Sequence, residues 1–387
     1  MSLRITDSGA VAVRTPAPRD VWRELYDSDP HALRYHAPAW VDLLSAFGRY
    51  EDASRLYSLP DGRLAVLPMV RRRLLSGVVR EASFPPAWGM GGLLASGGVR
   101  ASDVAAVFAD LASRRVARTS LRPNPMTGPV WEAARPPGVV AVPRLAHVLD
   151  LEGGFDHVWN KRFLGQARTA VRKAERSGLT VRCDTSGRLL PVFYELFDRS
   201  LDRWAATQHE PRALARWRGH RRDPLRKLQM MAEWLGEDCR VWIAWLDGRP
   251  AAGILVIQGP SANYTRGAMD KELAGPTRAN YLLHRLAVED ACAAGCRYYH
   301  MGETGPSPAL AQFKTRFGAR PHPYAEYHIE ALPLIALDRA LRRSVKRVIG
   351  FKDVPTGPSP ERSAPARSRH GSLGKLVRTP SARRSRR

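Results

Sequence analysis

The stretch RANYLLHRLAVEDACAAGCRYYHMGE (278–303) decides the fold of this chain. Apolar residues recur every three or four positions over 278–294, a spacing that predicts a long helix ending at Gly295. YYHM (298–301) then predicts a short strand, and 308–317 predicts a further helix. A strand–helix–strand order at the end of a domain is typical of a mixed sheet with helices packed against it.

Residues upstream of this stretch predict more helices and strands. Apolar runs predict antiparallel strands over 239–246, 251–258 and 262–268. Residues 155–177 predict one continuous helix, whereas the proline-broken segment 123–138 predicts a surface loop. The fold class is therefore α+β, with mixed, mainly antiparallel sheets in two halves that divide near residue 150.

Composition narrows the class of protein. The 387 residues carry 61 Lys+Arg against 37 Asp+Glu, a formal net charge of +24, with a globular apolar fraction of 44%. The four cysteines form no CxxC pair or Cys/His cluster, so we expect no metal site and a reducing compartment. Because no signal peptide and no apolar run of about 18 residues occurs, we expect a cytoplasmic location.

The C-terminal part is basic as well. Residues 331–351 predict an amphipathic helix with Arg and Lys on its polar side. It could dock on its own domain, or lie on the anionic inner face of a membrane. Residues 352–387 hold ten Lys/Arg and two acidic residues, a net of 10 − 2 = +8, and predict a disordered tail.

Three segments carry a resemblance to a known family. ARTAVRKAERSGL (167–179), YTRGAMD (264–270) and LAQFKTRFGARPHPYAEY (310–327) resemble the GNAT superfamily in its two-lobed, Fem-like branch. That branch holds the peptidoglycan bridge aminoacyltransferases and the CelD/BioF-like acetyltransferase domain. PAWVDLL (38–44) resembles part of its first lobe.

The resemblance implies an organisation and a reaction. It implies two GNAT-like lobes, 1–150 on the acceptor side and 151–330 on the acyl-donor side, followed by the basic helix and the tail. The family moves an acyl group from a thioester or an aminoacyl-tRNA ester onto an amine, and the acceptor substrate itself brings the nucleophile. No tightly bound cofactor is therefore expected, with aminoacyl-tRNA or acetyl-CoA as co-substrate.

Two residues are candidates for catalysis. Lys314 matches the lysine of a Phe-Lys pair that touches the reacting centre in Fem-like enzymes, with Phe313 as its neighbour. A fixed cation there would stabilise the oxyanion of the tetrahedral intermediate. Glu303, at the end of the short strand, is a candidate proton acceptor, although His284, His300 or water could serve instead.

The donor site is expected beside the strand 262–268 and the helix that follows it. Tyr264 and Arg266 alternate with their neighbours along the strand, so we expect both on the face of the cleft. In acetyl-CoA enzymes of the superfamily a glycine-rich loop precedes this helix, but in ELAGPT (272–277) only Gly275 fits. The candidate donor-binding residues are Tyr264, Arg266, Gly275, Arg278, Asn280 and Phe313.

Two further groups complete the predicted sites. Arg168, Arg172 and Arg176 are spaced by four and predict a basic stripe, either for RNA phosphates or as an ordinary solvated helix face. In the first lobe, Trp40, Trp88 and Gly89 resemble residues that border the acceptor cleft.

These observations favour N-acyl transfer to an amine, with aminoacyl-tRNA as donor and a cell-wall precursor or another amine as acceptor. Peripheral contact of 331–387 with an anionic membrane would then follow. One alternative is a CelD/BioF-like N-acetyltransferase that uses acetyl-CoA on a small molecule or sugar amine. Another is a non-catalytic basic protein that binds nucleic acid.

Overall fold

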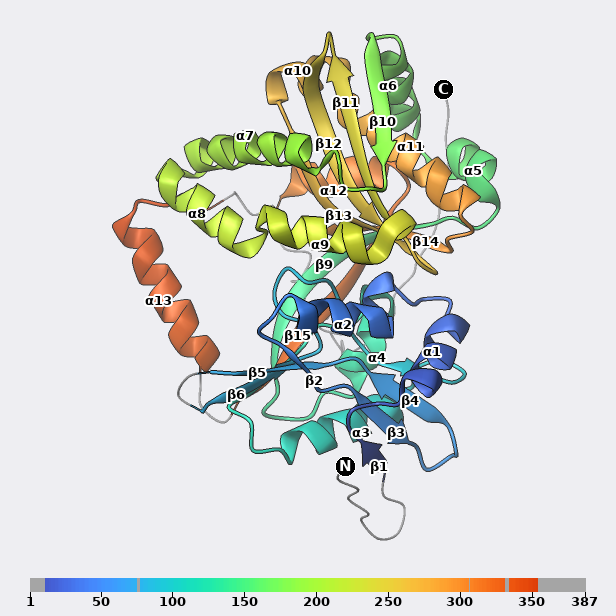
Figure 1. Ribbon diagram of the computed structural model, residues 1–387, viewed down its shortest axis with the longest axis vertical. Coiled ribbons are helices and arrows are strands. Elements are labelled where there is room, and N and C mark those ends of the chain that lie inside the picture. The colour runs from blue at the N-terminus through green and yellow to red at the C-terminus, as the bar shows by residue number, and fades with distance from the viewer. Residues whose placement is uncertain (1–10, 75–76, 306, 331–333, 354–387) are drawn as a thin grey trace, which may run out of the picture.

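A computed structural model describes residues 11–74, 77–305, 307–330 and 334–353 (Figure 1). Of the predicted disordered tail, residues 354–387 lie outside the described residues. The first lobe contains β1 (Ala12–Arg14), α1 (Arg19–Ser28), α2 (Pro38–Ala46), β2 (Glu51–Asp52), β3 (Arg55–Ser58), β4 (Leu64–Leu67), β5 (Val70–Arg73), β6 (Val79–Ala82), β7 (Leu94–Ala95), α3 (Ala101–Ala112), β8 (Arg118–Leu121), α4 (Gly128–Ala133) and β9 (Val140–Asp150).

The second lobe follows the α+β order predicted from the sequence. Its elements are α5 (Gly154–His157), α6 (Gly165–Glu175), β10 (Leu179–Asp184), α7 (Leu190–Gln208), α8 (Arg212–Arg222), α9 (Leu225–Leu235), β11 (Cys239–Leu246), β12 (Arg249–Ile257), β13 (Ala262–Met269), α10 (Lys271–Thr277), α11 (Ala279–Ala293), β14 (Tyr298–Glu303), α12 (Pro308–Arg316), β15 (Arg320–Glu330) and, beyond it, α13 (Leu334–Val348).

One mixed sheet runs through both lobes. Its strand order is β10-β11-β12-β13-β14-β9-β15-β8-β6-β5-β2, and β1-β3-β4-β7 form a smaller sheet in the first lobe. The long strands β9 and β15 pair antiparallel and join the lobes, since β9 also pairs with β14 and β15 with β8. The last strand before α13 is therefore part of the first lobe too, and the boundary at residue 150 stays a prediction.

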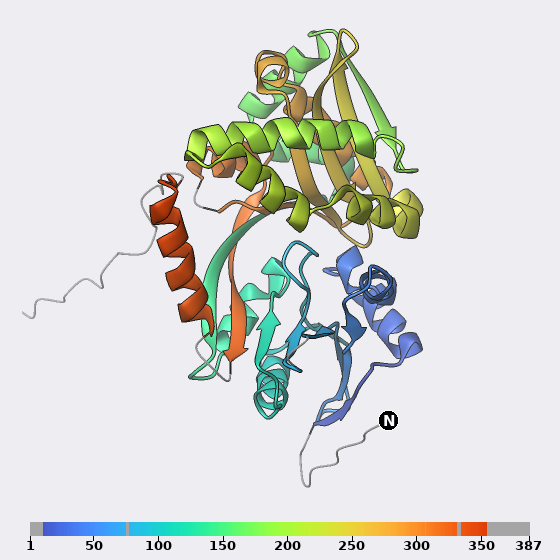
Figure 2. The same ribbon diagram turned by 60° about the vertical axis from the view of Figure 1, so that its left-hand side comes forward.

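Helices cover both faces of the second-lobe sheet (Figure 2). α7 and α9 pack against β11 and β12 on the face that meets the first lobe. α6 and α11 pack on the opposite face, around Val171 and Leu283. No helix among the described residues is long and apolar enough to cross a membrane.

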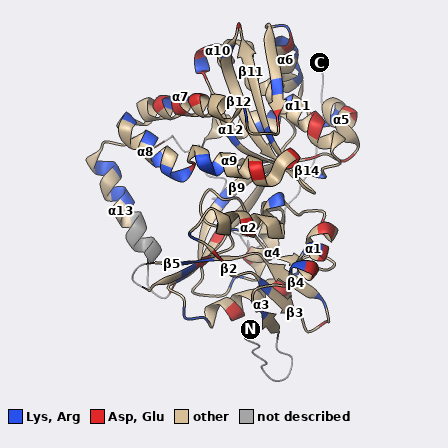
Figure 3. Ribbon diagram, in the orientation of Figure 1, with Lys and Arg blue, Asp and Glu red and all other residues tan. Residues whose placement is uncertain are grey.

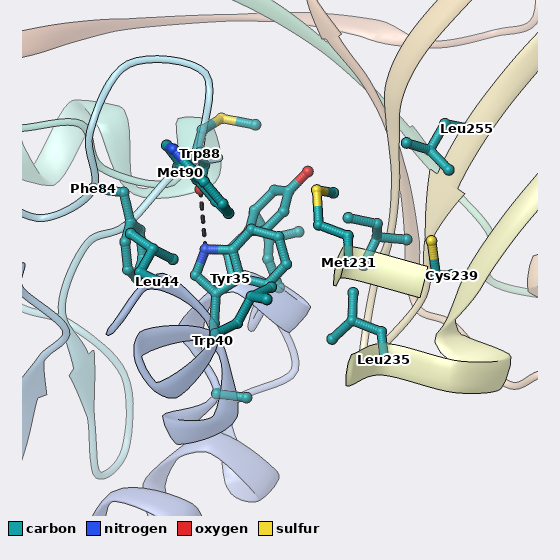
Figure 4. Packing of buried hydrophobic residues seen from close by; sticks show 14 of the residues in the cluster. Tyr35, Trp40, Leu44, Phe84, Trp88, Met90, Met231, Leu235, Cys239 and Leu255 are labelled. Carbon is teal, nitrogen blue, oxygen red and sulfur yellow. Dashed lines mark hydrogen bonds between the residues drawn. The ribbon is translucent and has the colours of Figure 1, made fainter. Parts of the chain in front are cut away.

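The lobes meet in a shared hydrophobic core (Figure 4). Tyr35, Trp40 and Trp88 of the first lobe pack in one buried cluster with Met231 and Leu235 of α9. Burial of large aromatic side chains supplies much of the free energy that holds such contacts together. The two lobes are thus held in a defined relation, which a site shared by both of them requires.

Two predicted elements are wrong in detail. The expected helix 155–177 is interrupted, because a π-helical turn (Val158–Arg162) and an extended Phe163 separate α5 from α6. The expected loop 123–138 contains α4, whose Trp131 is buried against Phe108 and Tyr327. Proline in the first turn of α4 is compatible with a helix, since the N–H groups there have no intrahelical partner.

Candidate active site

The most distinctive feature of the second lobe is the opening between β13 and β14. These parallel strands pair only at Ala262↔Tyr299 and Asn263↔His300, and diverge over the rest of their described length. The register of β13 against β12 shifts so that Thr265 has no Cα partner, which is a β-bulge. Beyond Asn263 and His300, the backbone groups of β13 and β14 therefore have no partner in the ladder between these two strands.

The bulge places the side chains of Tyr264 and Arg266 on opposite faces of the sheet, although they were expected to share one. The Tyr264 ring packs edge-on to His284 in the core of the second lobe, at 4.7 Å between centroids. Arg266 forms a bidentate ion pair with Asp223, at 2.9 Å from Nε and Nη2. Strict alternation is wrong here because the extra residue reverses the pleat beyond it.

Tyr264 remains next to the opening. The Tyr264 hydroxyl lies directly against Gly267. A Cβ atom at Gly267 would be 2.0 Å from the hydroxyl oxygen, so no side chain fits at this position. Burial raises the pKa of Tyr264 to about 12, so the hydroxyl is protonated near neutral pH and can donate a hydrogen bond.

Lys314 reaches the end of β14 from α12. Its Nζ donates to the carbonyl oxygens of Gly302 and Glu303, each at 2.8 Å, and to Thr304 Oγ1 at 3.3 Å. Burial lowers the pKa of Lys314 to about 7, against an opposing effect of the Glu303 carboxylate. Lys314 is 1% exposed, so its ammonium is buried at the end of β14, and an oxyanion would have to replace one of its three acceptors. Its catalytic role stays a prediction.

Glu303 lies where both lobes meet. The Tyr324 hydroxyl donates to its Oε1 at 2.5 Å, and guanidinium groups of Arg122 and Arg144 lie 3.9 and 3.7 Å from the carboxylate. Burial and the neighbouring carboxylate raise the pKa of Tyr324 well above its usual range, so this phenol stays a donor. The Glu303 side chain is 32% exposed, and its Oε2 is the oxygen that lies near Arg144.

The expected phosphate-binding segment is helical. Residues 271–277 form α10, and the Asp270 carboxylate caps its N-terminus by accepting from the backbone N–H groups of Glu272 and Leu273. A carboxylate at this end competes with a bound phosphate for the same donors. Gly275 therefore lies within a helix rather than in an open glycine loop.

The other predicted donor residues lie around the start of α11. Arg278 has a left-handed backbone (φ 60°) between α10 and α11, and Asn280 Nδ2 lies 3.0 Å from Met269 Sδ. Phe313 packs edge-on to Tyr281 and His284. These contacts place Phe313 beside the Tyr264–His284 pair, one turn before Arg316 on α12.

The predicted basic stripe is divided between two environments. Arg168 donates to the carbonyl oxygens of Trp159, Asn160 and Phe163, at 3.2, 3.2 and 2.7 Å, and so closes the end of the π-helical turn. Arg172 and Arg176 are exposed. RNA binding by the stripe stays a prediction, and two of its three members have free access to solvent.

The predicted acceptor residues lie in the core between the lobes. Trp40 Nε1 donates to the carbonyl oxygen of Trp88 at 3.0 Å, and both rings are buried (Figure 4). Gly89 has φ 99° and packs on the Tyr35 ring, where a Cβ would lie 2.6 Å from a ring atom. Their role in acceptor binding stays a prediction, and in this structure all three shape the contact between the lobes.

Sequence reasoning missed a buried charged network between the lobes. Asp223 lies between α8 and α9 and accepts from Lys227 Nζ at 2.8 Å as well as from Arg266. Lys227 also donates to the carbonyl oxygen of Ala87 at 2.6 Å and lies 4.5 Å from the Trp88 ring centroid. Although burial opposes it, the neighbouring Arg266 and Lys227 hold the pKa of Asp223 well below its usual range. The i,i+4 spacing of Asp223 and Lys227 is a local signal for their ion pair. Their contacts with Arg266, Ala87 and Trp88, however, join distant segments.

The burial of His300 on β14 can be tested through the pH dependence of stability. Among the described residues, neither of its ring nitrogens has a hydrogen-bond partner, and burial lowers the pKa of His300 to about 3. In the unfolded chain the group has its ordinary pKa of about 6.5, so acid favours unfolding between these two values. The free energy of unfolding is expected to fall when the pH is lowered from about 8 to about 5.5. In the His300→Leu variant this fall should be smaller by about 1.4 kcal/mol, because the leucine takes up no proton on unfolding. Urea denaturation at both pH values measures it, and an unchanged loss would show that native His300 accepts the proton.

Comparisons with known proteins agree with the fold described above. Residues 161–322 match the family model described as the acetyltransferase (GNAT) domain. The structure of FemX is similar over 83% of this chain and 98% of that chain, with a TM-score of 0.59 and 14% sequence identity. No sequence among curated proteins matches the chain.

Two other solved structures are similar at lower scores. The C-terminal domain of a putative lysylphosphatidylglycerol synthetase from Agrobacterium fabrum is 14% identical, with 84% of this chain and 95% of that chain covered and a TM-score of 0.45. A tandem GNAT protein from the clavulanic acid biosynthesis pathway is also 14% identical, with 76% and 94% covered and a TM-score of 0.42.

Residues 161–322 therefore match a GNAT acetyltransferase domain, and the fold over most of the chain is similar to that of FemX, as the resemblance of its segments predicted.

Proposed function

We propose that this protein transfers an aminoacyl group from aminoacyl-tRNA to the amine of an acceptor, with a cell-wall precursor as the expected acceptor class. The opening between β13 and β14, with the bulge at Thr265 beside it, carries the proposal. A carbonyl group seated there would meet unpaired backbone groups and the neighbourhood of Lys314. Stabilisation of the developing oxyanion by fixed donors usually contributes more to the rate of acyl transfer than any other single effect.

The reaction needs few protein groups. The acceptor nitrogen attacks the ester carbonyl carbon, a C–N bond forms, and the C–O bond to the ribose breaks. The nitrogen loses a proton, for which the Glu303 carboxylate is a candidate acceptor. The released ribose oxygen gains a proton, and the Tyr264 hydroxyl next to the opening is a candidate donor.

The capped α10 supports the choice of a tRNA ester over a thioester. With Asp270 on its N-terminus and Glu272 in its first turn, α10 offers no open anion site for a pyrophosphate. The exposed Arg172 and Arg176 are available for RNA phosphates. Acetyl-CoA remains the second candidate donor, favoured by the acetyltransferase model that matches residues 161–322.

A donor screen tests the proposal. Purified protein is incubated with aminoacyl-tRNA or with acetyl-CoA, and both the thermal shift and transfer to an amine acceptor are measured. We expect salt-sensitive binding and turnover with charged tRNA, because phosphate contacts weaken steeply with salt. Turnover with acetyl-CoA alone would establish the second candidate. RNA binding that is indifferent to the aminoacyl group and unaccompanied by turnover would indicate a non-catalytic binding protein.

A further inference from the structure

Helix α13 lies apart from both lobes, at the edge of the molecule between α8 and β5 (Figures 1 and 2). In its described part, residues 340–348, the apolar side chains of Leu341, Val345 and Val348 are 63%, 47% and 85% exposed. Their spacing of four and three puts them on one side of the helix. No described element covers this side, although exposed aliphatic side chains are unfavourable in water.

Cations accompany the exposed aliphatic residues. Arg342, Arg343 and Arg347 are exposed on the same helix. Lys346 lies beside them and pairs with Asp353. A helix with one aliphatic side and a basic remainder is suited to the boundary between the headgroups and the acyl chains of a bilayer.

Helix α8 has a similar character. Its sequence RALARWRGHRR holds five arginines and no acidic residue. Three of these arginines pair with carboxylates outside the helix, whereas Arg212 and Arg221 form no ion pair among the described residues. Trp217 is 57% exposed and points away from α7, since Gly219 is the position that packs on Leu201 of that helix. The Arg221 guanidinium lies over the Trp217 ring at 5.2 Å from its centroid. A tryptophan with a cation at its face is typical of membrane–water interfaces.

The two helices are neighbours at one edge of the molecule. The backbone N–H of Lys352, just after α13, donates to the carbonyl oxygen of Gln208 at 2.8 Å, next to the turn that leads into α8. Lys and Arg mark both helices on the same edge of the molecule (Figure 3). We call this surface, α8 together with residues 340–348, the basic docking surface.

We propose that the basic docking surface binds an anionic lipid bilayer. Charge complementarity selects an anionic partner, and the aliphatic side of α13 distinguishes lipid from nucleic acid. RNA phosphates would engage the cations and leave Leu341, Val345 and Val348 in water, whereas a bilayer would bury them. The sequence alone pointed to 331–387, and the structure adds α8 and its exposed tryptophan.

The surface adjoins the candidate active site. α8 ends at Arg222, and the carboxylate of the next residue, Asp223, holds Arg266 next to the bulge of β13.

Flotation of the full-length protein with liposomes tests this inference. Vesicles of phosphatidylcholine are compared with vesicles that also contain phosphatidylglycerol. We expect binding to the anionic vesicles alone, weakened by salt. Removal of one cation, as in Arg221→Ser, should lower the partition coefficient about fivefold. Trp217→Ala and Val345→Glu should each lower it as well.

Trp234 provides the matched control. Trp234 is 43% exposed on α9, outside the basic docking surface, and acidic residues lie close to it in the sequence at Glu233 and Glu237. Because these carboxylates would be repelled by an anionic bilayer, Trp234→Ala should leave flotation unchanged. Circular dichroism verifies that every variant is folded. Equal flotation of wild type, Trp217→Ala and Val345→Glu would overturn the proposal and assign any binding to the tail. Loss of flotation on addition of RNA, with no effect of the apolar substitutions, would overturn it in favour of nucleic acid. Flotation is independent of acyl transfer, so its failure leaves the proposed function standing.

Discussion

Replacing Lys314 by Ala is expected to lower kcat/KM for acyl transfer by a factor of roughly 30 to 1,000. This factor corresponds to a loss of about 2–4 kcal/mol of transition-state stabilisation. The physical reason is the position of Nζ, which holds the carbonyl oxygens of Gly302 and Glu303 at the opening. Loss of the side chain removes the cation that the proposed mechanism places next to the reacting carbonyl, and it leaves two backbone acceptors without this donor. Steady-state kinetics with the donor that responds in the screen measures the effect.

Lys314→Met is the matched control for volume. It keeps most of the buried stem and removes only the charge and the donors, so we expect a similar kinetic loss. The pH profile gives a second readout, because the pKa of Lys314 is about 7 and the cation is lost above it. Wild-type kcat/KM should therefore fall as the pH rises through about 7. A Met variant with full activity would show that the ammonium takes no part in the reaction.

Replacing Asp223 by Asn is expected to lower the free energy of unfolding by about 3–5 kcal/mol. The carboxylate is buried and balances three cations, Arg222, Arg266 and Lys227. The amide keeps the shape but leaves the buried Lys227 ammonium without a counter-charge. Urea denaturation followed by tryptophan fluorescence reports the loss, since Trp88 lies next to Lys227.

A double-mutant cycle separates the ion pair from general packing. Lys227→Met fills similar space without a charge, so Asp223→Asn combined with Lys227→Met should be less destabilised than the sum of the two single changes, by at least about 1 kcal/mol. Additive effects, or a single Asp223→Asn loss below about 1 kcal/mol, would contradict the view that this network holds the lobes together.

Much of the second lobe could be predicted from local patterns. The strand β11, the helix α11 and the strand β14 follow from apolar periodicity and from glycine at their ends, since these signals depend on near neighbours alone. Lys314 is a candidate because Phe313 and Lys314 match the Phe-Lys pair of Fem-like enzymes, and Glu303 because it lies at the end of a predicted strand; their roles stay predictions. The basic character of α13 is likewise a property of composition.

The long strands β9 and β15 show where local patterns fail. Proline argues against a central strand, yet Pro143 lies in β9 and Pro321 and Pro323 lie in β15. In the tertiary structure each proline falls where one neighbouring strand is missing. β14 pairs with β9 only from Ala146 onward, and β8 pairs with β15 only from Tyr327 onward. The missing N–H therefore faces no partner strand.

The sequence by itself determined the α+β class, the order of elements in the second lobe and the excess of positive charge, because periodicity, turn residues and composition are local properties. Tertiary structure alone decided which side chains meet. It placed Arg266 on Asp223, Lys227 on the first lobe and Trp40 in the core between the lobes. Such contacts depend on a β-bulge and on segments more than 40 residues apart, as in the pair of Arg266 with Asp223 (a separation of 43), and no short-range pattern encodes either.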